Sequence, residues 1–473
     1  MNTDRRQQAL QVRVAAAELA ASRPHPRHVA NGDEQKFRGP YHEPNYLASF
    51  TKGMPHDPDT GLLDDPNDFQ QFVNGIDSGD PRDFTDTRLG PVSAQNGGTA
   101  PFKLRAWESQ GAGNTFDLEG PDAQAVTMPP APALGSEELT AEIGEVYAQA
   151  LLRDVEFTQF SCDDAIVCTR EGRVNTILAC LNELEWFKDE ECCDLSPQEL
   201  SRKRGKLTRQ TAFRGITPGD EIGPYISQFL LAGNRGINSS DSDGQTLEGY
   251  VSYGALRIDQ RVRFATPEVD YMTSWEEWLK VQDGADLRGA ERYEPNGARR
   301  FITTPRDLAT YVHYDALYEA YLNACLILLA QGTPFDPGIP FQRQDEKDHQ
   351  QGFAHFGGPH ILSLVTEVAT RALKAVRFQK FNVHRRLRPE VLAARLEKKD
   401  VLGVAVPELD AMAYDLSDIL RIVRAKNQNV LLPMAFPEGS PMHPSYGAGH
   451  ATVAGACVTI LKAFFDHNRP LAL

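Results

Sequence analysis

The chain has 473 residues and a formal net charge of −16, from 65 acidic and 49 basic side chains. This balance disfavours nucleic acid as a partner, because a polyanion is repelled by an acidic surface. No apolar run approaches the length of about eighteen residues needed to cross a bilayer, and the polar residues 1–8 do not resemble a secretory signal. We therefore expect no membrane span, and the compartment stays unknown.

The first 135 residues are predicted to form one helix and a long irregular arm. Residues 4–21 are rich in Gln, Ala and Val and are expected to form an amphipathic helix. From Pro24 to about Gly135 the sequence is polar, with many Pro, Gly and Asp residues. A loop of this length is unusual inside a compact domain and favours an arm that crosses neighbouring subunits. We accordingly divide the chain into an N-terminal helix with its arm, residues 1–135, and a helical domain, residues 136–473.

Apolar residues at helical spacing predict several core helices in the second part. The expected helices cover residues 136–154, 173–187, 304–331, 359–378 and 408–426, with a short one after Ser274. The third begins with Thr-Pro and is predicted as one long, central helix. Residues 250–264 alternate as in a β-hairpin. The predicted fold class is mainly α, with packed four-helix bundles and one small hairpin.

The stretch 441–452 reads Pro-Met-His-Pro-Ser-Tyr-Gly-Ala-Gly-His-Ala-Thr. Its prolines and glycines prevent a regular helix, and from Ala451 onward small and apolar residues predict a buried helix. A glycine loop that opens a helix leaves backbone N–H groups unpaired, and such groups bind anions. His450 lies at the junction, where its imidazole could transfer protons.

The segment 380–388 places four positive charges within nine residues. If one helix continued through it, Lys380 and Arg388 would lie on the same face, about two turns apart. In an acidic chain this cluster favours a small anionic ligand. Arg385, Arg386 and Glu390 are instead expected to form surface ion pairs.

The basic segment followed by Pro-Ser-x-Gly-x-Gly-His resembles the vanadium-dependent haloperoxidases, in particular the bromoperoxidases of red algae and cyanobacteria. These enzymes share their site with the histidine acid phosphatases. The resemblance is most specific over residues 356–390 and 438–466. It implies a vanadate cofactor, with halide, hydrogen peroxide and a small organic substrate as reactants, and hypohalous acid as the product. It also implies a homo-oligomer as large as a dodecamer.

The same resemblance assigns a role to individual residues. Lys380 would polarise the bound peroxide, and Arg388 would pair two equatorial vanadate oxygens as a planar fork. The Gly449 N–H would donate a further hydrogen bond, and His450 would be the acid–base group. His443 matches a second histidine typical of bromoperoxidases, which favours bromide and iodide over chloride.

Two departures from the family pattern stand out. Ala448 replaces a serine whose hydroxyl bonds an equatorial oxygen, a loss of about 1.5–3 kcal/mol, or roughly tenfold to a hundredfold in vanadate affinity. The family also places a second arginine and the axial vanadium histidine in a later helix, and neither has a match here. We expect a separate C-terminal polypeptide, an incomplete chain, or a protein that has lost the reaction.

A structural calcium is a further expectation. The irregular, oxygen-rich residues 345–348 could bind a hard cation, and the resemblance marks Phe341 and Asp348 as matching calcium positions. The alternative is a solvated acidic turn.

The seven cysteines lack the paired Cys-x2–4-Cys units of a zinc site. A local or intersubunit disulfide is the better prediction for the cysteines between Cys162 and Cys193. Cys325 and Cys457 lie in apolar helical sequence and are predicted to be buried free thiols.

Two other functions remain open from the sequence. Phosphate has the same geometry as vanadate, so an acid phosphatase-like phosphomonoesterase is one alternative. The missing axial histidine, which acts there as the nucleophile, argues against both enzymes equally. A non-catalytic oxyanion-binding subunit is the other alternative.

Overall fold

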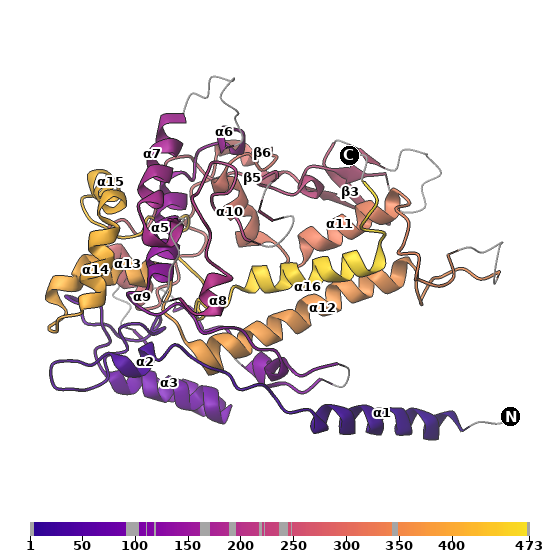
Figure 1. The fold of residues 1–473 in the computed structure, drawn as a ribbon, viewed down its shortest axis with the longest axis horizontal. Helices are drawn as coiled ribbons and strands as arrows, with labels where there is room; N and C mark the ends of the chain where they lie inside the picture. The colour runs from indigo at the N-terminus through magenta and orange to yellow at the C-terminus, as the bar shows by residue number, and fades with distance from the viewer. Residues whose placement is uncertain are drawn as a thin grey trace.

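The computed structural model describes residues 4–90, 104–109, 111–117, 120–160, 171–188, 195–216, 220–221, 223–235, 245–246, 248–342 and 349–470. Helices dominate these residues, and the strands form short antiparallel pairs (Figure 1). The prediction of a mainly α fold is therefore confirmed. Within the described ranges, no helix combines the length and apolar character that a bilayer crossing requires.

The α-helices are α1 (Arg5–Ser22), α2 (Asp33–Lys36), α3 (Pro66–Ser78), α4 (Pro81–Asp86), α5 (Glu137–Leu151), α6 (Phe157–Phe160), α7 (Glu171–Asn182), α8 (Pro197–Leu200), α9 (Trp275–Gln282), α10 (Pro305–Tyr314), α11 (Glu319–Ala330), α12 (Gly358–Phe378), α13 (Pro389–Lys398), α14 (Pro407–Asp415), α15 (Ser417–Asn427) and α16 (Gly449–Phe464). A π-helical turn, η7 (Gln379–His384), continues α12. The strand pairs are β1 (Gly233–Asn234) with β2 (Gln245–Thr246), β3 (Tyr250–Tyr253) with β4 (Leu256–Asp259), and β5 (Val262–Arg263) with β6 (Arg299–Arg300).

Two large core clusters organise the helices. In the first, α5 packs against α7 and α15, and apolar residues of α13 and α14 join the same cluster. Ser136 caps α5 by accepting from the Leu139 N–H at 3.2 Å. In the second, α11, α12 and α16 bury Val365 and Cys457, and α12 and α16 lie side by side (Figure 1). Cys325 and Cys457 are buried free thiols, as predicted.

The predicted long helix over 304–331 is wrong, because the chain breaks at Asp315. α10 ends at Tyr314, and α11 begins only at Glu319. The break is stable because the Ala316 N–H donates to the Glu319 carboxylate at 3.2 Å instead of to a helical carbonyl. The break also leaves the Asp315 side chain free of helical constraint, at a position that the site uses.

Two other predicted helices are also interrupted. The one over 173–187 ends as α7 at Asn182, whose side chain accepts from the Leu207 N–H and donates to the Leu207 carbonyl. The one over 408–426 divides into α14 and α15 at Leu416, whose buried side chain joins the first core cluster.

The predicted hairpin over 250–264 is observed only as far as Asp259, with Val251 opposite Ile258. β5 pairs with β6 instead, because the buried Gln260 side chain donates to the Phe229 carbonyl at 2.7 Å and interrupts the strand.

The two terminal helices differ from their predictions in burial. α1 is not amphipathic in its packing: it buries no residue, and it extends away from the body of the molecule (Figure 1). The helix after Ala451 is α16, which was predicted to be buried. It buries Val453, Cys457 and Phe464 against its neighbours, while Ala451 and Val458 are exposed. Its packing partners in the described chain cover only one face.

The arm before residue 136 is more ordered than predicted. It contains α3, which starts at an Asp65 cap followed by Pro66 and buries Phe69 and Phe72. These aromatic rings pack with Phe381 of η7, at 6.4 Å between the ring centroids of Phe72 and Phe381. The arm therefore supports the segment that carries the basic cluster.

Arg395 of α13 connects the arm to the helical domain, and its replacement should lower the stability of the protein. Its fully buried guanidinium donates to the carbonyls of Gly61 at 2.8 Å and Leu47 at 3.3 Å, and burial lowers its pKa to about 9. Arg395→Met leaves these carbonyls unpaired, so we expect urea titration to show about 2–5 kcal/mol less stability. Replacing the exposed Arg424 by Met should change the stability by less than about 0.5 kcal/mol. Equal losses of stability in the two variants would contradict the role assigned to Arg395.

Candidate oxyanion site

Three cations converge where α12, η7 and α13 meet. Arg377 ends α12, Lys380 lies in η7, and Arg388 is the N-cap of α13. One helix does not run through to residue 388, because Arg385 adopts a φ of 37° and the chain turns there. Lys380 and Arg388 approach one another through this turn, and each of Arg377 and Arg388 lowers the Lys380 pKa.

The Lys380 amine holds the loop that precedes α16. Its Nζ donates to the carbonyls of Pro444 at 3.0 Å and Ser445 at 3.2 Å. Burial, and then the charges of Arg388 and Arg377, lower its pKa to about 6. Near neutral pH the amine is therefore largely uncharged until an anion approaches it.

Arg388 lines a cavity of about 700 Å³. Its Nε donates to Ser440 Oγ at 3.0 Å, and the Ser440 hydroxyl in turn donates to the Glu390 carboxylate. In the part of the chain that the structure describes, Nε is the one Arg388 nitrogen with a hydrogen-bond acceptor. The other guanidinium nitrogens can serve a ligand in the cavity.

The loop around Ser440 is held by residues that the sequence did not indicate. The Ser440 carbonyl accepts from Lys52 Nζ and from the Arg105 guanidinium, both at 2.8 Å. Lys52 is fully buried beside Glu390, at 3.8 Å, and burial lowers its pKa to about 7. No local signal could have linked Lys52 to a loop nearly four hundred residues later.

Glu390 and the two neighbouring arginines differ in their surroundings. Arg385 pairs with Glu34 at 2.8 Å and Arg386 with Glu142 at 2.9 Å, so the predicted ion pairs exist, but these arginine side chains are mostly buried and not at the surface. Glu390, in contrast, is 1% exposed and belongs to the Ser440 network.

The glycine loop ends in an uncapped helix N-terminus. α16 begins at Gly449, and its N-cap Ala448 has no side chain that can accept a hydrogen bond. A Cβ added at Gly449 would meet no atom within 4 Å, so the space beside it is open. Free N–H groups at a helix start attract anions.

His450, in the first turn of α16, faces Asp315. Its Nε2 lies 3.2 Å from the Asp315 carboxylate, which is 7% exposed, whereas the imidazole is 48% exposed. His450 lines the same cavity as Arg388, whereas Lys380 and His443 are not among its lining residues. The break between α10 and α11 is what places Asp315 here.

His443 lies among the three cations. Its Nδ1 is 2.8 Å from the Pro444 carbonyl, and its Nε2 is 3.7 Å from Glu108, which also pairs with Arg377. Burial lowers the His443 pKa, and the charges of Arg388, Lys380 and Arg377 lower it further. The His443 imidazole is therefore neutral near neutral pH.

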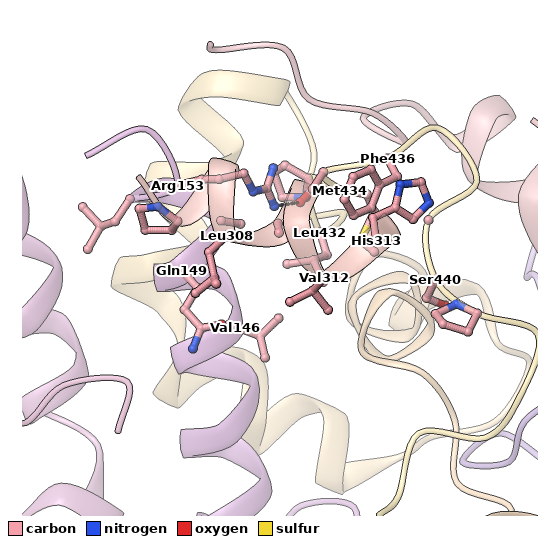
Figure 2. Close-up of a pocket in the computed structure, with 18 of the residues that line it drawn as sticks. Val146, Gln149, Arg153, Leu308, Val312, His313, Leu432, Met434, Phe436 and Ser440 are labelled. Atoms are coloured by element: carbon pink, nitrogen blue, oxygen red, sulfur yellow. Dashed lines mark hydrogen bonds between the residues drawn. The ribbon is translucent and has the colours of Figure 1, made fainter. Parts of the chain in front are cut away.

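The cavity itself is mostly apolar. Figure 2 shows Val146, Leu308, Val312, Leu432, Met434 and Phe436 around it, with His313 and Ser440 on one side. It offers an apolar chamber next to the guanidinium of Arg388 and the imidazole of His450.

Several predicted metal and disulfide residues lie outside the described residues. Asp348, Cys162, Cys168, Cys192 and Cys193 are among them. Cys180 is described and is a free thiol, so it forms no disulfide in this structure. Phe341 is described: it has a φ of 63°, and its carbonyl accepts from the Gly352 N–H at 3.3 Å.

The groups present fit a compact oxyanion. The buried Arg377 Nη1 has no partner among the described residues, Arg388 faces the cavity, and the start of α16 is uncapped. Arg377, Arg388 and protonated Lys380 repel one another, and a bound anion offsets this repulsion. Vanadate, as a phosphate-shaped oxyanion, fits this donor set.

The fold and this cationic loop site define a helical protein built to bind an oxyanion. No family model matches the sequence. It is 49% identical over 493 residues to a vanadium-dependent bromoperoxidase of Corallina pilulifera, covering 96% of this chain and 81% of the relative. The corresponding enzyme of Corallina officinalis is 49% identical over 495 residues, with the same coverage. A vanadium-dependent bromoperoxidase of Ascophyllum nodosum is 33% identical over 442 residues, covering 90% of this chain and 70% of the relative.

A solved structure supports the fold. The homohexameric second vanadate-dependent bromoperoxidase of Ascophyllum nodosum superposes with a TM-score of 0.75 at 24% identity, over 98% of this chain and 70% of that one. By its sequence relatives, the chain belongs to the vanadium-dependent bromoperoxidases.

Proposed function

We propose that this protein is a vanadate-dependent bromoperoxidase. It oxidises bromide and iodide with hydrogen peroxide to hypohalous acid, which halogenates small organic molecules. Family membership supports this function. The observation that carries it is the convergence of Arg377, Lys380 and Arg388 on the loop before α16.

Each residue has a separate task in this proposal. Bound vanadate supplies a Lewis-acidic centre that activates peroxide without a change of oxidation state. Arg388 holds oxyanion oxygens with its free guanidinium nitrogens, and the Gly449 N–H donates from the helix start. Lys380 adds positive charge when the anion binds, and His450 transfers protons with Asp315 as its partner. His443 remains a neutral hydrogen-bonding group that favours bromide.

Bromination of monochlorodimedone tests the proposal. We expect the purified chain to brominate this compound with peroxide only after vanadate is added. We expect the same requirement for vanadate in assays that also contain a C-terminal fragment from a relative. Hydrolysis of p-nitrophenyl phosphate, inhibited competitively by vanadate and without bromination, would instead establish a phosphatase. Tight vanadate binding without either activity would establish a non-catalytic subunit.

Ala448→Ser should strengthen vanadate binding. A hydroxyl at the N-cap of α16 can donate to an oxyanion oxygen, a bond to a charged group of about 1.5–3 kcal/mol. We expect calorimetry to show roughly tenfold to a hundredfold tighter binding. Ala448→Val, which adds bulk without a hydroxyl, is the control. Equal affinities for the serine variant and the native protein would show that the hydroxyl caps the helix instead.

Anion binding should take up a proton at Lys380. Because the Lys380 pKa is about 6 in the free protein, its amine is mostly neutral above this pH, and a bound dianion favours the protonated form. Sulfate, which does not titrate near neutrality, should therefore bind more weakly as pH rises from about 6 to 8, by at most roughly tenfold per unit. Calorimetry in buffers of different ionisation enthalpy measures the uptake, and Lys380→Met should abolish it. Binding heats independent of the buffer would contradict the assignment.

We also propose a homo-oligomer. α1 exposes Leu10 at 62%, and on its opposite face Val12 and Leu19 at 69% and 55%, apolar side chains that neighbouring copies could cover. The related Ascophyllum structure is a homohexamer. Light scattering of the full chain distinguishes a hexamer from the dodecamer implied by the resemblance, and a monomeric mass would refute the proposal. We retain residues 1–135 as the assembly arm and 136–473 as the catalytic domain.

A structural calcium at Phe341 and Asp348 is the remaining proposal for this chain. The Phe341 carbonyl, which accepts from the Gly352 N–H at 3.3 Å, is the kind of oxygen ligand that calcium prefers. Calcium should raise the melting temperature of the native chain but not of Asp348→Asn.

A further inference from the structure

We propose that Glu291, His313 and Glu438 form a binding site for a divalent transition-metal ion, an assignment that does not depend on the proposed function. The three residues come from distant parts of the sequence. Glu291 precedes β6, His313 lies in the last turn of α10, and Glu438 belongs to the loop before α16. One possible ligand atom from each lies within 4.8 Å of the others.

The two carboxylates are buried, and all three side chains are incompletely paired. His313 Nε2 is 2.6 Å from Glu438 Oε1, and His313 Nδ1 is 3.8 Å from Glu291 Oε1. The Glu291 and Glu438 side chains are 3% and 4% exposed. Among the described residues, Glu291 Oε1, His313 Nδ1 and Glu438 Oε2 have no hydrogen-bond partner. Buried carboxylate oxygens without a partner are costly, and a cation shared between them removes that cost.

Nearby arginines do not neutralise the two carboxylates directly. Arg105 donates to the main-chain carbonyls of Glu438, at 3.3 Å, and Ser440, at 2.8 Å. Arg288 is engaged by Asp286 through two hydrogen bonds of 2.7 Å. One imidazole thus faces two carboxylates, and even its protonated form balances only one of them. A divalent cation balances both.

The ligand types indicate the class of ion. One imidazole with two carboxylates suits zinc or manganese, whereas calcium prefers six to eight oxygens. The His313 ring stacks on Phe436, with centroids 3.9 Å apart and planes at 22°, which restricts its rotation. His313 and Glu438 also line the cavity, on the side where Figure 2 shows His313. Water from the cavity can complete the coordination.

A bound ion would connect α10 to the loop that carries Ser440. Glu438 lies two residues before Ser440, whose hydroxyl accepts from Arg388. The ion should therefore stiffen the loop, and it should raise the melting temperature of the full chain even without vanadate.

The test uses the full chain after chelator treatment, without vanadate. We expect calorimetry with zinc chloride and manganese chloride to show one saturable site and a raised melting temperature. Glu291→Gln and His313→Gln should each weaken binding at least tenfold, because each removes a ligand. Glu294→Gln, three residues from Glu291 and outside the cluster, should bind as the native chain does.

Cobalt provides the decisive spectrum. Cobalt at the proposed site gives visible bands without thiolate-to-metal charge transfer, and these bands should disappear in both ligand variants. Charge-transfer bands from thiolate would assign the metal to cysteines and overturn the proposal. The absence of saturable metal binding would also overturn the proposal. Unchanged metal affinity would do the same in a ligand variant that keeps the native circular dichroism spectrum.

Discussion

Arg388→Met is expected to weaken vanadate binding by roughly thirtyfold to five-thousandfold, which corresponds to the 2–5 kcal/mol lost when one partner of a buried charge pair is removed. The guanidinium is partly buried where it lines the cavity, and burial already lowers its pKa. Its Nε is fixed by Ser440, so the remaining nitrogens are oriented before the anion arrives. At subsaturating vanadate, the bromination rate should fall in proportion to the loss of vanadate affinity.

Two comparisons separate the charge of Arg388 from its position. Arg388→Lys keeps the charge but loses the planar fork, and we expect an intermediate loss of affinity. Arg386→Met removes an equal charge two residues earlier, where the guanidinium pairs with Glu142, and should change vanadate affinity less than about threefold. Equal effects at positions 386 and 388 would mean that only the general positive potential matters.

The second large effect is expected for His450→Ala, which should lower the bromination kcat by roughly a hundredfold to ten-thousandfold. The imidazole lines the cavity and can deliver protons there, but the cations and helix start provide the anion binding. Vanadate affinity should therefore change less than about threefold. A parallel loss of kcat and vanadate binding would assign His450 to the anion site instead.

Asp315 should act through His450 as a positioning residue. The Asp315 carboxylate is nearly buried and lies 3.2 Å from His450 Nε2. We expect Asp315→Asn to lower kcat about tenfold while the bromide KM stays unchanged, and Asp315→Glu to restore much of it. Loss of kcat in both variants, together with lower melting temperatures, would indicate a purely structural role.

Local sequence signals predicted much of the helical fold. Pro305 marks a helix start, and Leu139 and Ile143 lie at the spacing of a buried face. The same approach missed α3, because its short amphipathic run lies in a Pro- and Asp-rich stretch. It also joined α10 to α11, since helical periodicity continues on both sides of Asp315. Local patterns describe what each segment can form, but neighbouring side chains decide where it stops.

By itself, the sequence determined the mainly helical class, the basic segment and the glycine loop with His450, because backbone preferences and helical spacing are local properties. Tertiary structure alone decided which of those groups meet. Arg388 acquires Ser440 as its partner, and His450 acquires Asp315, across 52 and 135 residues. These contacts depend on how α12, α13 and α16 pack, on the turn at Arg385 and on the break after α10. Such long-range packing is set by the summed burial of many side chains, which no single stretch of sequence contains.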